Sequence, residues 1–238
     1  MLSFSCVPLV GSLGIYMAVL GLCMHMWPSM LWGLSLLSFS LVLWVVEDQV
    51  KEGFSDAILM SELSVKYAIL IFIFSEFVFF LSVLFSAFYM VGKGWAEAWV
   101  VVDFYGVPSL VSVVLLSSGV SLTAAHYQFT VGGQWGVVWL LLTVFMGVLF
   151  LGVQTLEWEE NAFSLSSGIG GSLFYMITGF HGLHVVIGVL LNVSLAVVVI
   201  FSATGVVSAV KQEGVIWYWH FVDVVWLFVY LGLYWYCM

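Results

Sequence analysis

The stretch that decides the fold is residues 169–201, IGGSLFYMITGFHGLHVVIGVLLNVSLAVVVIF, which contains no Asp, Glu, Lys or Arg. It exceeds the roughly 20 apolar residues that a helix needs to cross a hydrocarbon core of about 30 Å. In lipid every backbone polar group must be paired internally, and an α-helix achieves this within one segment. The stretch therefore predicts a transmembrane helix that tilts or projects beyond the hydrocarbon.

Six further apolar stretches flank it, and the sequence as a whole predicts an all-α membrane protein with seven transmembrane helices. The predicted spans are Val7–Trp27, Met30–Val46, Leu63–Val91, Tyr105–Ala125, Trp135–Leu156, Ile169–Phe201 and Val215–Tyr236. A tight turn at Trp27–Ser29 is expected to join the first two helices into a hairpin. The linkers are too short to hold a soluble domain, so we expect residues 1–238 to form a single domain.

Composition supports lipid as the solvent of most of the surface. Hydrophobic residues make up 64% of the chain and charged residues 7%, and the mean hydropathy is +1.20. Lys and Arg together number 4 against 13 acids, for a formal net charge of −9. Nucleic-acid binding requires a basic footprint, so this composition argues against a nucleic-acid partner.

The few lysines predict the orientation of the chain in the membrane. An excess of Lys and Arg marks the inner side of a membrane protein. If the N-terminus lies inside, Lys51, Lys66 and Lys211 fall inside and Lys93 falls outside. We therefore expect an inner N-terminus and an outer C-terminus. The uncharged segment Met1–Val10 does not have the basic start of a cleavable signal peptide.

One carboxylate lies deep in a predicted span. Glu76 lies about 20 Å along the helix axis from Leu63 at 1.5 Å per residue, among several phenylalanines. An ionisable group at membrane depth costs roughly 2.5–3.5 kcal/mol on insertion scales and is a functional hypothesis by default. The sequence favours its neutral, protonated form. The alternative is a carboxylic acid that serves only as a structural hydrogen bond between helices.

Two pairs of polar residues lie one helical turn apart. His181 and His184 share one face of the sixth helix, and His220 and Asp223 repeat the spacing on the seventh. Two histidines so placed can bind a metal ion or haem iron. The alternative interpretation is that they form hydrogen bonds between helices.

Longer motifs then point to a family. The runs TGFHGLHV at Thr178–Val185 and WYWHFVDVVWL at Trp217–Leu227 closely resemble subunit three of cytochrome c oxidase. Ser75–Phe80 followed by Ser86–Tyr89 is similar to that family's third helix, with Glu76 at the position of its buried glutamate. Further matches to its fourth and fifth helices are Ser118–Ser121, Ala125–His126 and Gln154, Glu157, Glu160 and Phe163.

The resemblance implies a subunit without a redox centre beside the catalytic subunit of a haem–copper oxidase. It implies a hairpin of helices one and two, separated by a lipid cleft from a bundle of helices three to seven. Phospholipid occupies that cleft, which has been proposed as a route for oxygen. The subunit is thought to sustain proton uptake and stabilise the catalytic subunit, and its buried glutamate, matched by Glu76, reacts with hydrophobic carbodiimides.

The resemblance also implies which cofactors and partners to expect. Haem a and copper belong to partner chains, since the 5 histidines here are too few for two haems and a copper. We therefore expect no metal in this chain, and packing or hydrogen-bonding roles for His181 and His184. The implied partners are catalytic subunit one, subunit two, accessory subunits and structural phospholipids. The implied role is to support electron transfer from cytochrome c to oxygen and the coupled proton pumping.

The chain departs from the family where lipid headgroups are expected. After the second helix, only Lys51 remains of two expected cations, next to Glu52. Near the end of the sixth helix, Val198 and Phe201 replace basic residues. Phosphate recognition normally uses Arg or Lys. Phospholipid is therefore expected to bind more weakly, to have another headgroup, or to use cations of partner subunits.

Two other functions remain open on the sequence. A related quinol oxidase subunit would share the helix pattern and differ only in its partners. A small proton-coupled transporter could use Glu76 as carrier, but the internal repeats typical of transporters are not found. Residues whose codons are rich in A and C are scarce in this chain, which suggests that it is encoded in an organelle genome. We therefore expect it in the mitochondrial inner membrane, with its N-terminus on the matrix side. The alternative is a bacterial plasma membrane.

Overall fold

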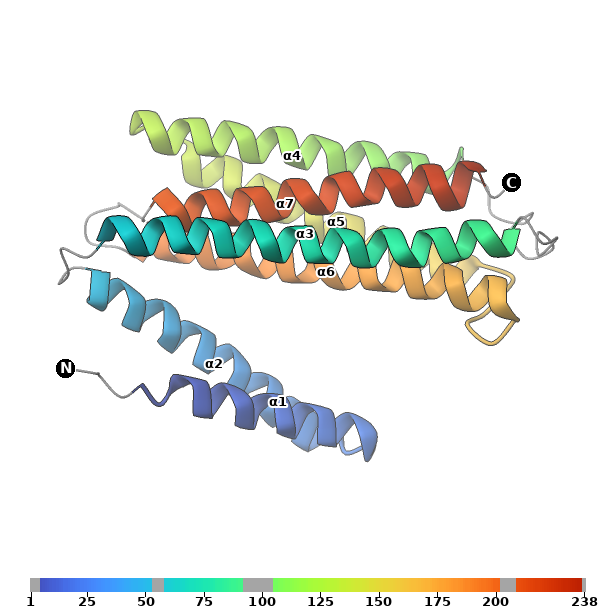
Figure 1. The fold of residues 1–238 in the computed structure, drawn as a ribbon, viewed down its shortest axis with the longest axis horizontal. Helices are drawn as coiled ribbons and strands as arrows, with labels where there is room; N and C mark the ends of the chain where they lie inside the picture. The colour runs from blue at the N-terminus through green and yellow to red at the C-terminus, as the bar shows by residue number, and fades with distance from the viewer. Residues whose placement is uncertain (1–4, 53–57, 92–104, 202–208, 237–238) are drawn as a thin grey trace. The chain divides into compact units, whose positions relative to one another are not determined.

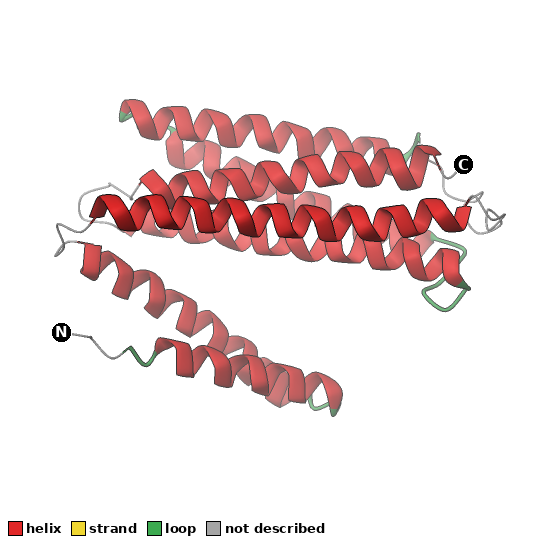
Figure 2. Ribbon diagram, in the orientation of Figure 1, coloured by secondary structure: helices red, strands yellow, loops and turns green. Residues whose placement is uncertain are grey.

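The computed structural model describes residues 5–52, 58–91, 105–201 and 209–236, and all the regular structure there is helical (Figure 2). The helices are α1 Val7–Cys23, α2 Trp27–Glu52, α3 Ile58–Val91, α4 Val107–Val131, α5 Gly136–Glu160, α6 Ile169–Phe201 and α7 Ala209–Val229, which continues as a π-helix, η2, over Tyr230–Tyr236. They form two compact units, Met1–Glu62 and Leu63–Met238 (Figure 1). The predicted all-α class with seven helices is confirmed.

Five of the helices, α3 to α7, are long and apolar enough to cross a membrane. The helix α1 is apolar but has only 17 residues, so the first two membrane crossings stay a prediction. The bounds of α6 match the predicted span, Ile169–Phe201.

The turn predicted at Trp27–Ser29 is wrong. The chain reverses at Met24–Met26, where His25 has a φ of 52°, and α2 already begins at Trp27. Pro28 fits there because the first turn of a helix does not use its backbone N–H groups.

In the first unit, small residues bring the α1 and α2 backbones into direct contact. A Cβ added at Gly33 would overlap the backbone of Ala18 and lie 2.7 Å from the carbonyl oxygen of Gly14. A Cβ at Gly14 would lie 2.9 Å from the backbone nitrogen of Leu37. Such contacts are typical of transmembrane helix pairs, whose association depends on close packing because lipid tails are as apolar as the helices. The predicted hairpin is therefore held by glycines.

In the second unit, two buried tryptophans of α7 connect four helices. The indole of Trp219 lies 2.7 Å from the Cβ positions of Gly147 on α5 and Gly188 on α6, and its Nε1 donates to Ser118 Oγ on α4 at 2.9 Å. Both glycines therefore make room for one side chain. A polar contact between transmembrane helices contributes about 0.6 kcal/mol on average, so packing dominates at this position.

Two turns further along α7, Trp226 makes equivalent contacts. Its Nε1 donates to Ser112 Oγ on α4 at 2.9 Å. Its ring lies edge-on to Phe150 of α5 at 4.8 Å and tilted against His181 of α6 at 4.9 Å between centroids. Trp219 contacts Ser118, whereas Trp226, which lies later on α7, contacts Ser112, which lies earlier on α4. The two helices are therefore antiparallel, and these two contacts fix their register.

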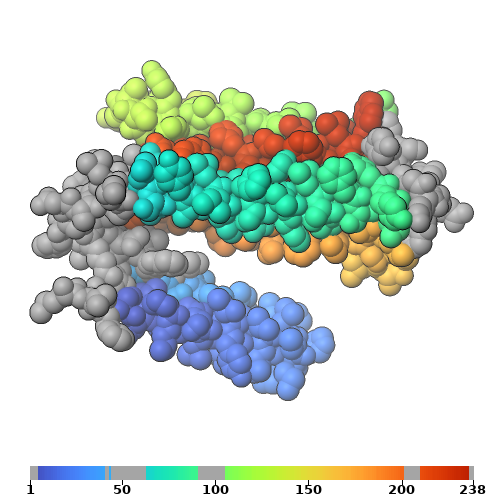
Figure 3. Space-filling model, in the orientation of Figure 1, coloured from blue at the N-terminus to red at the C-terminus, as the bar shows by residue number. Residues whose placement is uncertain are grey.

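The helix α3 packs on this unit mainly through aromatic rings. Phe77 lies 5.9 Å from Phe228 of α7, and Phe79 lies 5.2 Å from Phe180 of α6, both edge-on. Figure 3 shows α3 as the teal-to-green ridge along the face of the second unit. Beside these ring contacts, α3 borders a groove that contains the candidate functional side chains.

We predict that Gly33→Ala separates α1 from α2. A Cys pair at Gly11 and Ser40 reports the contact, since their Cβ positions are 3.8 Å apart, which is ideal for a disulfide. In a chain without its native cysteines this pair should cross-link efficiently, and adding Gly33→Ala should lower the yield several-fold. The control is Gly152→Ala, whose Cβ would meet nothing within 4 Å. An unchanged yield with Gly33→Ala would contradict the packing argument.

Candidate functional site

The second unit carries an apolar groove of about 880 Å³ between α3, α6 and α7. This volume is in the range of sites that bind one small molecule. Most of its wall is aliphatic or aromatic; the lining residues are Ile69, Phe72, Ser75, Glu76, Phe79, Phe180, Leu183, His184, Ile187, Leu191, Ser194, Lys211, Gly214, Val215 and Tyr218. The groove therefore offers an apolar wall with few polar groups.

Glu76 and His184 meet in this groove. Glu76 Oε2 lies 3.1 Å from His184 Nε2, which joins α3 to α6. The Glu76 side chain is 27% exposed and that of His184 is 10% exposed. The hydrogen-bond partner of Glu76, which the sequence left open, is thus His184.

The hydrogen bonds of His184 define the protons of the pair. Its Nδ1 lies 2.7 Å from the carbonyl oxygen of Phe180, which can only accept, so Nδ1 carries a hydrogen. In a neutral imidazole Nε2 is then an acceptor, and Glu76 must donate as a carboxylic acid. The other arrangement with the same protons is a carboxylate beside an imidazolium. In both, the pair has no net charge.

The surroundings of the pair are mostly aromatic. Phe80 lies edge-on to the His184 ring at 5.0 Å, and Tyr218 stacks parallel to it at 6.5 Å. The Tyr218 hydroxyl donates to the backbone oxygen of His184 at 3.5 Å, so it does not solvate the carboxyl group. Separated charges are costly in such an apolar setting. The contact with His184 therefore lets the carboxyl group lie in the groove as part of a pair without net charge.

One end of the groove is charged. Lys66 Nζ of α3 and Glu213 Oε2 of α7 form an ion pair at 2.8 Å. Lys211, two residues before Glu213, lines the groove. Along α3, Lys66 and Glu76 are about 15 Å apart at 1.5 Å per residue. The groove thus extends from Lys211 near the start of α7, two residues before the ion-paired Glu213, to the Glu76–His184 pair.

His181 has a different environment from His184. It is fully buried, and its Nε2 donates to the backbone oxygen of Val222 at 3.3 Å. Its ring packs against Phe150 and Trp226. Within residues 5–52, 58–91, 105–201 and 209–236, no three His, Cys, Asp or Glu side chains are grouped as a metal site. The two histidines that could have shared a metal are used in separate contacts between helices.

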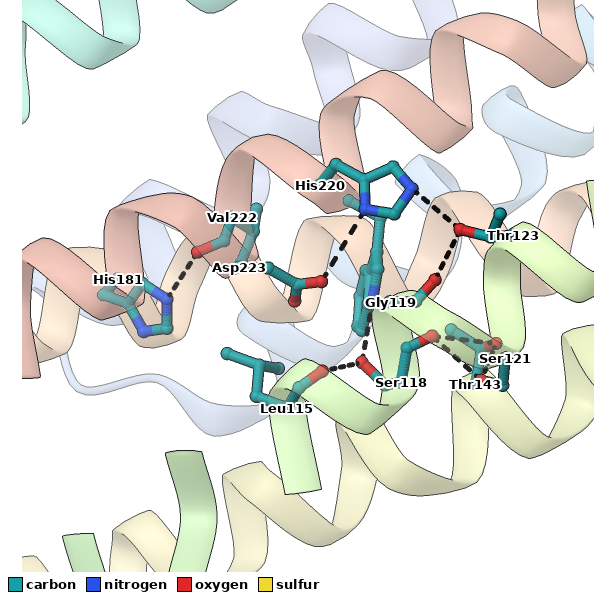
Figure 4. Close-up of polar contacts among 11 residues, drawn as sticks. Leu115, Ser118, Gly119, Ser121, Thr123, Thr143, His181, His220, Val222 and Asp223 are labelled. Carbon is teal, nitrogen blue, oxygen red and sulfur yellow. Dashed lines mark hydrogen bonds and ion pairs between the residues drawn. The ribbon is translucent and has the colours of Figure 1, made fainter. Parts of the chain in front are cut away.

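A second histidine–carboxyl pair joins α7 to α4 (Figure 4). His220 Nδ1 lies 3.9 Å from Asp223 Oδ2, and His220 Nε2 lies 3.4 Å from Thr123 Oγ1. Gly119 makes room for the carboxyl group, since a Cβ there would overlap Asp223 Oδ2. The sequence spacing of His220 and Asp223 therefore corresponds to a polar contact at the α4–α7 interface.

The structure joins some of the predicted site residues and leaves others apart. Glu76 meets His184, and His220 meets Asp223. Lys51 and Glu52 lie at the end of α2, but their side chains are outside the described part of the structure. Sequence reasoning missed the Lys66–Glu213 ion pair and Thr123. Opposite charges near the starts of α3 and α7 were a usable signal for the former, whereas one threonine among many gave none.

Known proteins similar to this chain share one description. The family model described as "Cytochrome c oxidase subunit III" matches residues 1–238. Cytochrome c oxidase subunit 3 of Marchantia polymorpha is 34% identical, and the alignment covers 96% of this chain and 92% of the relative. The proteins of the same name from Pongo abelii and Arabidopsis thaliana are 37% and 33% identical, covering 96% of this chain and 93% and 92% of theirs.

The proton assignment of the Glu76–His184 pair predicts how two variants differ. Glu76→Gln keeps a donor for His184 Nε2, so the thermal unfolding midpoint of the purified protein should change little. Glu76→Ala leaves that nitrogen unpaired in an apolar groove, at a cost of about 1–3 kcal/mol, and should lower the midpoint. Ser75→Ala is the control, because the Ser75 hydroxyl bonds only its own helix, at Phe72 O. Equal losses for Gln and Ala would show that an ion pair was required.

Proposed function

The chain belongs to the cytochrome c oxidase subunit III family, and we propose that it supports oxygen reduction from within the membrane by holding lipid beside the catalytic subunit. It is a non-catalytic subunit of an oxidoreductase complex and a multi-pass protein of the mitochondrial inner membrane. Haem a and copper are assigned to partner chains. The finer proposals below concern lipid, oxygen, protons and partners.

The observation that carries the proposal is the combination of an apolar groove, a charged end and a neutral acid–imidazole pair at depth. A phospholipid has the matching distribution of polarity. Its acyl chain would lie along Phe72, Phe79 and Ile187, while its headgroup would lie near Lys211. The Glu76–His184 pair has no net charge, so it can face an acyl chain at a lower cost than an isolated carboxylate.

The headgroup end has few cations for a phosphate. Lys66 is already paired with Glu213, and Val198, where the family has a basic residue, packs against the apolar core. Lysine binds phosphate as a point charge without the two-pronged geometry of arginine. We therefore propose a phospholipid held mainly by its acyl chains, with Lys211 as the headgroup contact within this chain and further cations supplied by partners.

The same groove suits molecular oxygen and a mobile proton. Oxygen is small and apolar, so a groove lined by rings and aliphatic side chains is a favourable path toward the catalytic subunit. The Glu76–His184 pair can pass one proton between carboxyl group and imidazole while remaining neutral as a unit. We propose that these properties sustain oxygen and proton access during turnover, while the chemistry takes place elsewhere.

The proposed partners are catalytic subunit one, subunit two and accessory subunits, with cytochrome c as the electron donor. The relatives are named for cytochrome c oxidase, which favours this donor over quinol. We place the N-terminus on the matrix side, because Lys66 and Lys211 then lie with Lys51 on the positive side of the membrane.

The main test is the behaviour of the assembled enzyme carrying Glu76→Gln. A complex purified through this chain should show the absorbance of haem a, and the variant should keep the haem a content and the initial rate of oxygen uptake. Labelling of this subunit by a hydrophobic carbodiimide should disappear, because its carboxyl target is gone. Loss of initial turnover in a fully assembled variant, or a native complex without haem a, would contradict the proposed function.

Filling the groove tests lipid binding directly. Leu183→Trp adds bulk to the α6 wall, so native mass spectrometry of the intact oxidase should show fewer retained phospholipids. The control is Leu141→Trp at an exposed position of α5 outside the groove. If both variants retain the wild-type complement of lipid, the groove is not the lipid site.

A further inference from the structure

The end of α5 carries a group of polar side chains on one face of the helix. Gln154, Glu157, Trp158 and Asn161 follow one another at intervals of three, one and three residues, which places them on the same side of α5. Gln154 and Glu157 are only 2% and 7% exposed. None of the four residues lines the groove, so the roles proposed for the groove do not account for them.

The hydrogen-bonding capacity of this face is only partly used. Gln154 Nε2 donates to Glu157 Oε2 at 3.0 Å. Four further atoms of the same face are buried and have no hydrogen-bond partner in the part of the chain that the structure describes. They are Gln154 Oε1, Glu157 Oε1, Trp158 Nε1 and Asn161 Nδ2. Buried polar atoms in native proteins are almost always paired, either with protein or with ordered water.

A tyrosine of η2 faces these side chains. Tyr234 is 1% exposed, and it lies close enough to interact with both Gln154 and Glu157. Its hydroxyl nevertheless lacks the geometry of a hydrogen bond to any described residue. Phe174 of α6 packs edge-on against the Tyr234 ring at 5.6 Å, and Tyr230 stacks on it at 6.0 Å. The ring is therefore held between other rings while its hydroxyl faces α5.

The cluster lies near the ends of two membrane spans. Glu157 comes three residues before the end of the span Gly136–Glu160, and Tyr234 comes one residue before the end of the span Val210–Trp235. At 1.5 Å per residue both are within about 5 Å of a span end along the helix axis. The aqueous phase at this surface of the membrane is thus about one helical turn away.

The unpaired atoms include both donors and acceptors, and this mixture indicates the class of ligand. Gln154 Oε1 and Glu157 Oε1 can accept, Trp158 Nε1 and Asn161 Nδ2 can only donate, and the Tyr234 hydroxyl can do both. A cation would serve only the acceptors, and an anion would serve only the donors. A buried water typically forms about three hydrogen bonds to polar groups that are otherwise unsatisfied, and it can donate and accept.

We propose that the end of α5 and the π-helix η2 enclose a site for ordered water, held by Gln154 Oε1, Glu157 Oε1 and the Tyr234 hydroxyl. Water at this site joins α5 to η2 through hydrogen bonds that the described side chains do not make directly. It thereby fixes the position of the π-helical end of α7. The inference depends on contacts within this chain and is independent of the lipid role proposed above.

The first test is a structure of the intact oxidase at a resolution that shows ordered water. We expect a density peak about 2.7–3.2 Å from Glu157 Oε1 and from at least one other unpaired atom of the cluster. Absence of such a peak, or a side chain bonded directly to Glu157 Oε1, would overturn the proposal. A peak about 2.0–2.6 Å from the oxygens would also overturn it, because that distance marks a bound cation.

The second test compares the same density in variants of the oxidase. Glu157→Leu removes the carboxyl group and should abolish the peak, whereas Glu157→Gln keeps a side-chain oxygen and should retain it. The control is Glu160→Leu, an exposed position at the same end of α5, which should leave the peak unchanged. If Glu157→Leu does not assemble, Tyr234→Phe, which removes only the hydroxyl, should weaken the peak. An unchanged peak in Glu157→Leu or Tyr234→Phe would contradict the assignment.

Discussion

The structure of the second unit depends on the insertion of Trp219 between two glycines. The indole occupies the space that side chains at Gly147 and Gly188 would take, and it reaches Ser118 through its only polar atom. Four helices are therefore positioned by one fully buried ring. In a membrane this constraint matters more than in water, because hydrophobic burial does not drive helices together and fitted contacts must do so.

The functional geometry follows from this packing. With α6 and α7 in fixed register, His181 points inward to the backbone of α7, while His184, one turn later, points into the groove toward α3. Phenylalanines hold α3 at the distance where Glu76 Oε2 lies within 3.1 Å of His184. On another side of α7, His220 and Asp223 meet α4. One helix thus lines the groove on one side and contacts α4 on another.

The helical class could be predicted, because a bilayer of fixed thickness requires long apolar segments that are visible in a single sequence. The bounds of α6 were predictable to the residue, whereas the turn before α2 was not, since Pro28 fits equally well in a turn and in a first helical turn. Glu76, His184, His220 and Asp223 stood out as polar residues at depth. The contacts of Glu76 with His184 and of His220 with Thr123 did not, because they depend on the rotation of α3 and α4, which is determined by side-chain fit and not by periodicity.

The glycine contact between α1 and α2 has a consequence for biosynthesis. The close contacts at its glycines fall between Gly11 and Ser40, so the hairpin can close as soon as its second helix leaves the ribosome. The second unit must wait longer, because Trp219 lies near the end of the chain and contacts helices made much earlier. Its early helices therefore reside in the bilayer without their central contact until the last span is inserted, and premature release of the nascent chain would leave a closed hairpin beside an unassembled bundle.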